Sequence, residues 1–343
     1  MRWTDIENDE SAQQCMAEPG PGLLSDLLKI KGPVMVLGGS GKMGKDLVLM
    51  LRRADQVLGL RRDIAVASTF GDRDALSLFQ NLNIICLQGD LADPAFVDDL
   101  PDMPNVLYMM GFKFGSSSDW RRAFHLNSIV PYLVGSHYRK SRIVVFSSGN
   151  PYPHTDVNGP GCTEDSHLDP AGVYGWSIVA RESAFQTTAI QNPDQRLCFY
   201  RLMYAQHLHY GVLVDLASMI WQGEPISLAM PAVNLISQRD ANDVAIRCLA
   251  HCSNPGPVFN VAGPVWPVRA IGRQLARQMC RKVKFEGQEP ELALLADDAH
   301  CRVTFGSYRD QVEEMISAAA SWVMRGGLSW HKPTHFGRVR HDY

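Results

Sequence analysis

Residues 32–54 read GPVMVLGGSGKMGKDLVLMLRRA, a short apolar run followed by a glycine cluster and a helical pattern. The apolar run at 34–37 is typical of a buried parallel strand. Gly38, Gly41 and Gly44 then form a G-x-x-G-x-x-G array. In such an array the glycines allow a sharp turn, close approach of a pyrophosphate, and tight helix–strand packing, while the helix N-terminus offers amide hydrogens to the phosphates. The stretch predicts a dinucleotide-binding unit, with a glycine-rich turn that binds nothing as the alternative.

Further apolar runs follow at regular intervals, separated by helical patterns. They read IAVAS at 64–68, NIICLQ at 83–88, NVLYMMG at 105–111 and SRIVVFSSG at 141–149. Strands that alternate with helices indicate a parallel, doubly wound sheet, whose strands all end at one edge. We therefore predict an α/β fold: a Rossmann-type sheet with a smaller, mostly helical C-terminal substrate lobe.

The chain divides into three parts on the same reasoning. Residues 1–30 are a polar leader with a short docking helix, and we expect its start to be frayed. Residues 31–203 form the dinucleotide-binding domain, to which 234–262 return. Residues 204–233 and 263–343 form the substrate lobe.

Bulk composition narrows the class of protein. The net charge is −3, from 33 basic and 36 acidic residues, which leaves no electrostatic footprint for nucleic acid or an anionic membrane. No secretory signal and no apolar run of membrane-spanning length is present. The eight cysteines are scattered, as expected for reduced thiols, so we predict a cytoplasmic protein. His207-x-His209 has no nearby third ligand, and we predict no metal site.

The end of the second strand bears on the type of dinucleotide. It reads Ala67-Ser68-Thr69, without the carboxylate that usually meets a free ribose hydroxyl. Ser68, Thr69, Arg73 and Lys42 are suited to a 2′-phosphate. The cofactor is therefore predicted to be NAD or NADP, with NADP favoured; the alternative is that Arg73 and Lys42 are solvated surface charges.

Several later motifs stand in a characteristic order. They are Gly89-Asp90-Leu91, Met110-Gly111-Phe112-Lys113, Asn127, Val145-Phe146-Ser147-Ser148, and Tyr174 to Glu182. With the glycine array they resemble the extended short-chain dehydrogenase/reductase family, of the NAD-dependent epimerase/dehydratase type, over residues 32–325. The resemblance implies a set of dinucleotide contacts: Gly38, Ser40, Gly41, Lys42, Met43, Gly44, Ser68, Thr69, Asp90, Leu91, Met110, Gly111, Lys113, Asn127 and Tyr174.

The resemblance also implies a catalytic tyrosine and serine, Tyr174 and Ser148, but the family's lysine is replaced by Ile178. A free tyrosine has a pKa of about 10, so only about 0.1% is phenolate at pH 7, and a nearby cation lowers that pKa by about 1–3 units. Isoleucine supplies no charge. Lys113, in the loop after the fourth strand, is the replacement we predict at the catalytic site, with a solvated loop lysine as the alternative. Arg181 lies two helical turns beyond Tyr174 on roughly the same side and is a second candidate for this replacement, but we expect a surface ion pair there instead.

Candidate substrate contacts follow two strand ends. Ser148, Asn150 and Tyr152 follow the fifth strand, and Arg201, Tyr204 and His207 follow a further predicted strand, LCFYRLM. For each of them plain packing is the alternative.

Three functions compete. The first is an NAD(P)-dependent oxidoreductase or epimerase/dehydratase acting on a sugar, sugar nucleotide or polyol. The second is a non-catalytic dinucleotide-binding protein with a broken proton relay. The third is a non-redox lyase that uses Tyr174 and Lys113. The resemblance also implies a homodimer formed through the helices at 120–138 and 174–188.

Overall fold

The computed structural model describes residues 1–331 and 334. Residues 332–333 and 335–343, which the sequence assigns to the substrate lobe, lie outside the described part. Among the described residues, no helix is both long enough and apolar enough to cross a bilayer.

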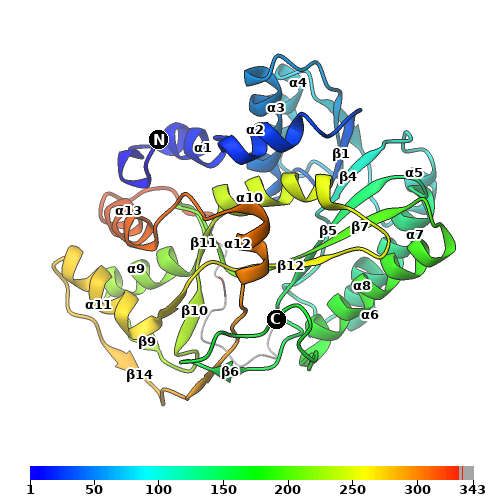
Figure 1. The fold of residues 1–343 in the computed structure, drawn as a ribbon. Helices are drawn as coiled ribbons and strands as arrows, with labels where there is room; N and C mark the ends of the chain where they lie inside the picture. The colour runs from blue at the N-terminus through cyan, green and yellow to red at the C-terminus, as the bar shows by residue number, and fades with distance from the viewer. Residues whose placement is uncertain (332–333, 335–343) are drawn as a thin grey trace.

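Seven parallel strands form the central sheet, in the order β12-β7-β5-β4-β1-β2-β3 (Figure 1). They are β1 (Val34–Leu37), β2 (Ile64–Ser68), β3 (Ile85–Gln88), β4 (Asn105–Tyr108), β5 (Arg142–Ser148), β7 (Arg196–Leu202) and β12 (Val258–Val261). The direction of winding reverses between β1 and β4. Open sheets bind ligands at the carboxyl ends of the strands at such a point. The predicted doubly wound sheet is confirmed.

Helices cover both faces of this sheet, which explains its continuous apolar strands. In β1, Val34 and Val36 face one core, and Met35 and Leu37 face the other; all four are fully buried. The first core is closed by α2 (Pro21–Leu27), α3 (Gly44–Val57), α4 (Arg73–Asn81), α10 (Gln238–Arg247), η3 (Cys248–His251) and α12 (Ala299–Phe305). The second is closed by α5 (Pro94–Asp98), α7 (Val130–His137) and α8 (Gly172–Gln191). The helix α6 (Trp120–Phe124) and the π-helical turn η2 (His125–Ile129) lead into α7.

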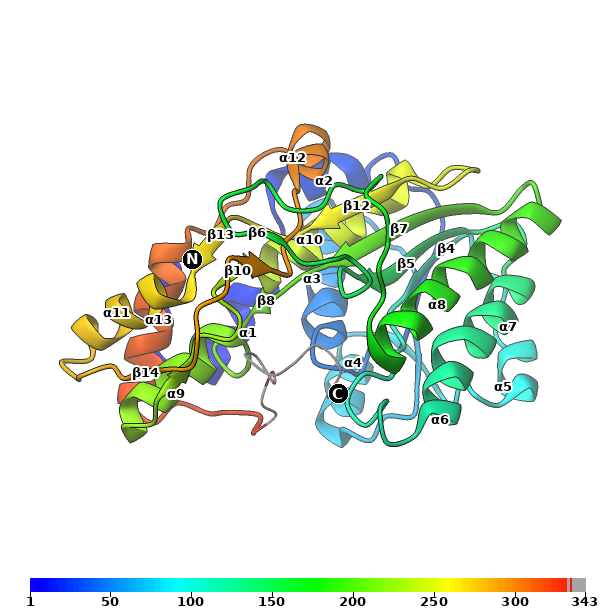
Figure 2. The same cartoon turned by 90° about the horizontal axis from the view of Figure 1, so that it is seen from below.

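A second, mostly helical lobe lies beside the sheet (Figure 2). Its core is built from α9 (Val212–Gln222), α11 (Val268–Gln278) and α13 (Val312–Met324). Short two-stranded ladders complete it and join it to the sheet domain: β10 (Ala232–Asn234) with β13 (Val265–Pro267), β9 (Ile226–Ser227) with β14 (Phe285–Glu286), β6 (Thr155–Asp156) with β15 (Leu292–Ala293), and β8 (Ala205–Gln206) with β11 (Ile236–Ser237).

Residues 3–16 of the N-terminal leader pack in the core of this second lobe, so the predicted frayed start is wrong. η1 (Trp3–Asp5) packs against α13, and Trp3 is 1% exposed. α1 (Asp9–Met16) buries Met16 in the same cluster. The terminal amino group pairs with Glu18 at 3.0 Å. The helix that η1 packs against lies about 300 residues later in the chain, and the polar composition of the segment gives no sign of this contact.

Candidate functional site

In the glycine loop between β1 and α3, packing requires glycine at two positions of the array but not at the third. Gly38 has a φ of 82°, and a Cβ there would stand 3.0 Å from the Met110 amide nitrogen. A Cβ on Gly44 would stand 2.6 Å from the Gly39 carbonyl oxygen. A Cβ on Gly41 would meet only the Gly38 oxygen, at an ordinary 3.4 Å. Packing therefore explains Gly38 and Gly44 but not Gly41, the position at which such an array is expected to let a pyrophosphate approach.

The start of α3 fits the phosphates of such a ligand. Its N-cap residue, Met43, makes no side-chain capping hydrogen bond. Ser40, in the loop, shares a 2.5 Å hydrogen bond with Ser68 at the end of β2. The helix thus presents its positive end at the loop that Gly41 leaves open. These residues fit a dinucleotide.

The residues expected around the adenosine half lie at the ends of β2 and β3. Thr69 and Arg73 are exposed, whereas Leu91 is buried. Asp90 closes its own turn by accepting from the Ala92 amide at 2.9 Å. Asp72 caps α4 by accepting from the Asp74 amide at 3.0 Å.

Asn127 pins the loop after β4. It is fully buried in η2, accepts from the Phe112 amide at 2.9 Å and donates to the Phe112 carbonyl at 2.7 Å. It also donates to Ser177 on α8 at 2.9 Å. Asn127 therefore sets the path of the Met110–Lys113 loop, through which it would act on a dinucleotide.

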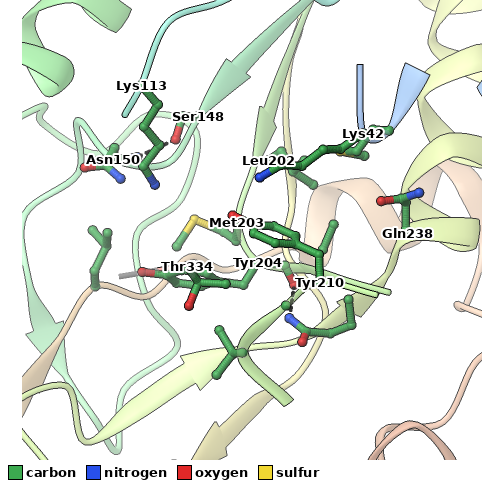
Figure 3. Close-up of a pocket in the computed structure, with 16 residues that line it drawn as sticks. Lys42, Lys113, Ser148, Asn150, Leu202, Met203, Tyr204, Tyr210, Gln238 and Thr334 are labelled. Carbon is green, nitrogen blue, oxygen red and sulfur yellow. Dashed lines mark hydrogen bonds between the residues drawn. The ribbon is translucent and has the colours of Figure 1, made fainter. Parts of the chain in front are cut away.

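A cavity of about 210 Å³ lies between the two lobes at the switch point (Figure 3). Six of the residues predicted from the sequence line it: Lys42, Met43, Lys113, Ser148, Asn150 and Tyr204. Sequence reasoning missed Tyr210, Gln238 and Thr334, which also line it. Tyr210 precedes α9, Gln238 begins α10 and Thr334 follows α13, so these three residues belong to no shared local motif that could have predicted them.

Two ammonium groups enter this cavity from different loops (Figure 3). Lys42 Nζ lies 3.6 Å from the centroid of the Tyr210 ring. Lys113 Nζ lies 5.3 Å from the centroid of the Tyr174 ring. Burial, together with the charge of Lys42, lowers the pKa of Lys113 to about 8. Both lysines are half-buried rather than solvated surface charges. The cavity thus combines a positive potential with the Ser148 hydroxyl.

The helix α8 carries Tyr174 at its first turn, half-buried, and Ile178 one turn later, fully buried. The expected surface ion pair of Arg181 is wrong. Arg181 is 5% exposed and donates to the Phe146 carbonyl at 2.7 Å and to Asn127 Oδ1 at 2.5 Å. Helical spacing places Arg181 on the side of Tyr174, but only packing shows that this side faces the sheet.

Tyr152 and Arg201 lie in a buried network. The Tyr152 hydroxyl donates to Asn260 at 2.7 Å and accepts from Arg201 at 2.7 Å. Arg201 also forms a two-point ion pair with Glu182, at 2.9 and 2.8 Å. Burial raises the pKa of Tyr152 to about 12. Neither residue lines the cavity described above, packing alone explains both, and their contact with substrate stays a prediction.

His207 is also explained by packing. It is 3% exposed, its Nδ1 accepts from the His209 amide at 2.9 Å, and its ring stacks on Trp330 at 4.9 Å. Its Nε2 lies 3.5 Å from Asp46 in the first turn of α3. Burial and the neighbouring His207 lower the pKa of His209 to about 4. Within the described part of the chain, no three potential ligands gather into a metal site.

No family model matches the chain, and no curated protein matches it. Solved structures do match. The UDP-Glc/GlcNAc 4-epimerase from Campylobacter jejuni superposes with a TM-score of 0.69 at 17% identity, over 86% of this chain and 100% of its own. UDP-N-acetylglucosamine 4-epimerase from Methanobrevibacter ruminantium M1 gives 0.68 at 16% identity, over 86% and 99%. The Bordetella bronchiseptica enzyme WbmG, in complex with NAD and UDP, gives 0.68 at 17% identity, over 88% and 98%. The chain therefore has the fold of the UDP-sugar 4-epimerases, and the predicted likeness to extended short-chain dehydrogenases/reductases is confirmed at the level of the fold.

Proposed function

We propose that this protein is an NAD(P)-dependent enzyme that epimerises, dehydrates or oxidises a sugar nucleotide or a related carbohydrate. One observation carries the proposal: the cavity at the switch point joins the glycine loop to Ser148 and Lys113, with Tyr174 beside Lys113. Sheet-edge cavities of this kind are the usual ligand sites of the fold. The structural neighbours are enzymes of UDP-sugars, which supports the substrate class.

The chain's own residues supply binding and proton transfer. A bound nicotinamide would exchange hydride with a substrate carbon. Ser148 would hold the substrate oxygen, and the Tyr174 phenol would exchange a proton with it. Lys113 would stabilise the phenolate, because its ammonium lies 5.3 Å from the tyrosine ring and a cation at this range favours the charged phenol. Lys113 would thus supply, from the loop after β4, the positive charge that a lysine at position 178 of α8 would otherwise provide.

The dinucleotide would lie across the glycine loop, with its adenosine half towards Asp90 and Leu91. The neighbour WbmG contains NAD, which supports a nicotinamide cofactor here. The preference for NADP rests on Thr69 and Arg73, which are exposed beside the end of β2. Ser68 shares its hydroxyl with Ser40, so it contributes less to this preference than the sequence suggests.

We further propose a homodimer formed through η2, α7 and α8. Ile129, Tyr132 and Trp176 on these elements are 50%, 40% and 56% exposed. Exposed large apolar side chains on neighbouring helices are typical of an interface.

Native mass spectrometry with NAD, NADH, NADP and NADPH tests the cofactor, and a UDP-sugar screen with Tyr174→Phe tests the chemistry. We expect hydride transfer to fall about tenfold or more in Tyr174→Phe. Tyr138→Phe is the matched control, because the Tyr138 hydroxyl is buried in the core against α7 without a hydrogen-bond partner among the described residues. Equal turnover in Tyr174→Phe and wild type would overturn the role of Tyr174.

The second candidate is a non-catalytic dinucleotide-binding protein. The fully buried Ile178, in place of a lysine, favours it. Tight dinucleotide binding without turnover of any UDP-sugar would support this candidate over the first.

A further inference from the structure

Arg181 is a buried cation without a counter-charge of its own. Three arginines are buried within the described part of the chain: Arg181, Arg201 and Arg239. Arg201 pairs with Glu182, and Arg239 pairs with Asp310 and Glu18. Arg181 forms no ion pair with any described carboxylate; its two acceptors are a carbonyl and an amide oxygen, and its Nε is buried without a partner. Buried charges in proteins are ordinarily paired, because an unpaired one loses its hydration without compensation.

The guanidinium of Arg181 lies against the Met110–Lys113 loop, which follows β4. A Cβ on Gly111 would stand 2.5 Å from Arg181 Nη2, so only glycine leaves room for the guanidinium. Gly111 itself is exposed. The preceding residue, Met110, contacts Gly38 of the glycine array, where a Cβ would meet its amide nitrogen at 3.0 Å. One glycine therefore separates the buried charge from the exposed side of the loop, beside the place where phosphates would bind.

The position on α8 connects this charge with the absent lysine. Seven residues are close to two helical turns, so Arg181 and Tyr174 lie on nearly the same face of the helix. Ile178 lies between them and is fully buried. The helix α8 therefore lacks the expected cation at position 178 and buries a different cation, Arg181, less than one turn later.

We propose that Arg181 is a positioning residue for the dinucleotide: it holds the 109–113 loop from behind and supplies positive charge through Gly111, with the diphosphate of the ligand as its counter-charge. The inference rests on the proposed function, since it requires a dinucleotide at the glycine loop. Arg181 does not touch the ligand. It acts through the loop and through the electrostatic potential, which reaches farther in a buried setting than in water.

The experiment compares two substitutions that separate charge from hydrogen bonding. Arg181→Lys keeps the charge, and Arg181→Gln keeps a donor without the charge. The affinity for NADH and NADPH is measured by titration calorimetry at low and high salt, after circular dichroism has shown that each variant is folded. Arg269→Gln is the matched control, because it removes a surface arginine paired with Glu289 on the far lobe.

We expect Arg181→Lys to bind within about threefold of wild type, and Arg181→Gln to lose about tenfold or more, with a weaker dependence on salt. Wild-type affinity in Arg181→Gln would overturn the inference, as would equal losses in both variants, which would indicate scaffolding alone. If Arg181→Gln does not fold, Gly111→Ala replaces it; its methyl group displaces the guanidinium, and unchanged affinity there would also overturn the inference. Wild type that binds neither dinucleotide would overturn the proposed function as well.

Discussion

Replacing Lys113 by methionine should make the free protein more stable while weakening its site. Burial and the charge of Lys42 lower the pKa of Lys113 from 10.5 to about 8. The folded state therefore holds this proton less tightly than the unfolded chain does, and the protonated lysine destabilises the fold below pH 8. Methionine keeps most of the length of the side chain and removes the charge.

The magnitude follows from the difference in pKa. The difference between a pKa of 10.5 and one of about 8 corresponds to at most roughly 3 kcal/mol of unfolding free energy, at about 1.36 kcal/mol for each pKa unit. Lys113 is only half-buried, and solvent screening reduces this to about 1–2 kcal/mol. With an unfolding entropy of about 2.1 cal/mol/K per residue, the melting temperature of a 343-residue chain should rise by about 1.5–3 °C.

The assay is thermal unfolding of wild type and Lys113→Met at neutral pH and near pH 9.5. The free energy of unfolding of the wild type should rise as the pH increases from about 8 to 10.5. In this range the Lys113 ammonium of the unfolded chain is still protonated, whereas the folded state has lost the proton. The difference in melting temperature between wild type and Lys113→Met should therefore be about half as large at the higher pH. Lys140→Met, at an exposed lysine, should show no such difference. A less stable Lys113→Met protein, or a difference in melting temperature that does not change with pH, would refute the reasoning.

Three other outcomes are expected. Gly41→Ala should fold normally but lose dinucleotide binding in calorimetry, whereas Gly44→Ala should fail to fold because its Cβ would stand 2.6 Å from a carbonyl oxygen; equal behaviour of the two would contradict the assignment of Gly41 to the ligand. Ile178→Lys should lower the melting temperature by several degrees, since it buries a second cation on α8 at a cost of about 2 kcal/mol or more; a gain in both stability and turnover would instead indicate a decayed enzyme. Trp176→Glu should give a monomer by light scattering, and an unaltered oligomer would remove α8 from the interface.

Local patterns were sufficient for the framework of this protein. The apolar run and glycine array at 32–54, and the alternation of strands and helices after it, predict the sheet, because strand and helix periodicities depend on near neighbours in the chain. Lys42, Lys113, Ser148 and Asn150 were placed at one edge for the same reason: each lies at or just beyond the end of a parallel strand.

Tertiary structure alone decided which side chains that framework uses and which it buries. Helical spacing puts Arg181 near Tyr174, but the contact with the Phe146 carbonyl determines that it is buried rather than on the surface. Tyr152 meets Asn260 across 108 positions of the chain, and Trp3 packs beneath α13. The free energy of such contacts depends on partners that no local window of sequence contains. Local sequence therefore determined the sheet and its loops, while packing determined which charges face the cavity.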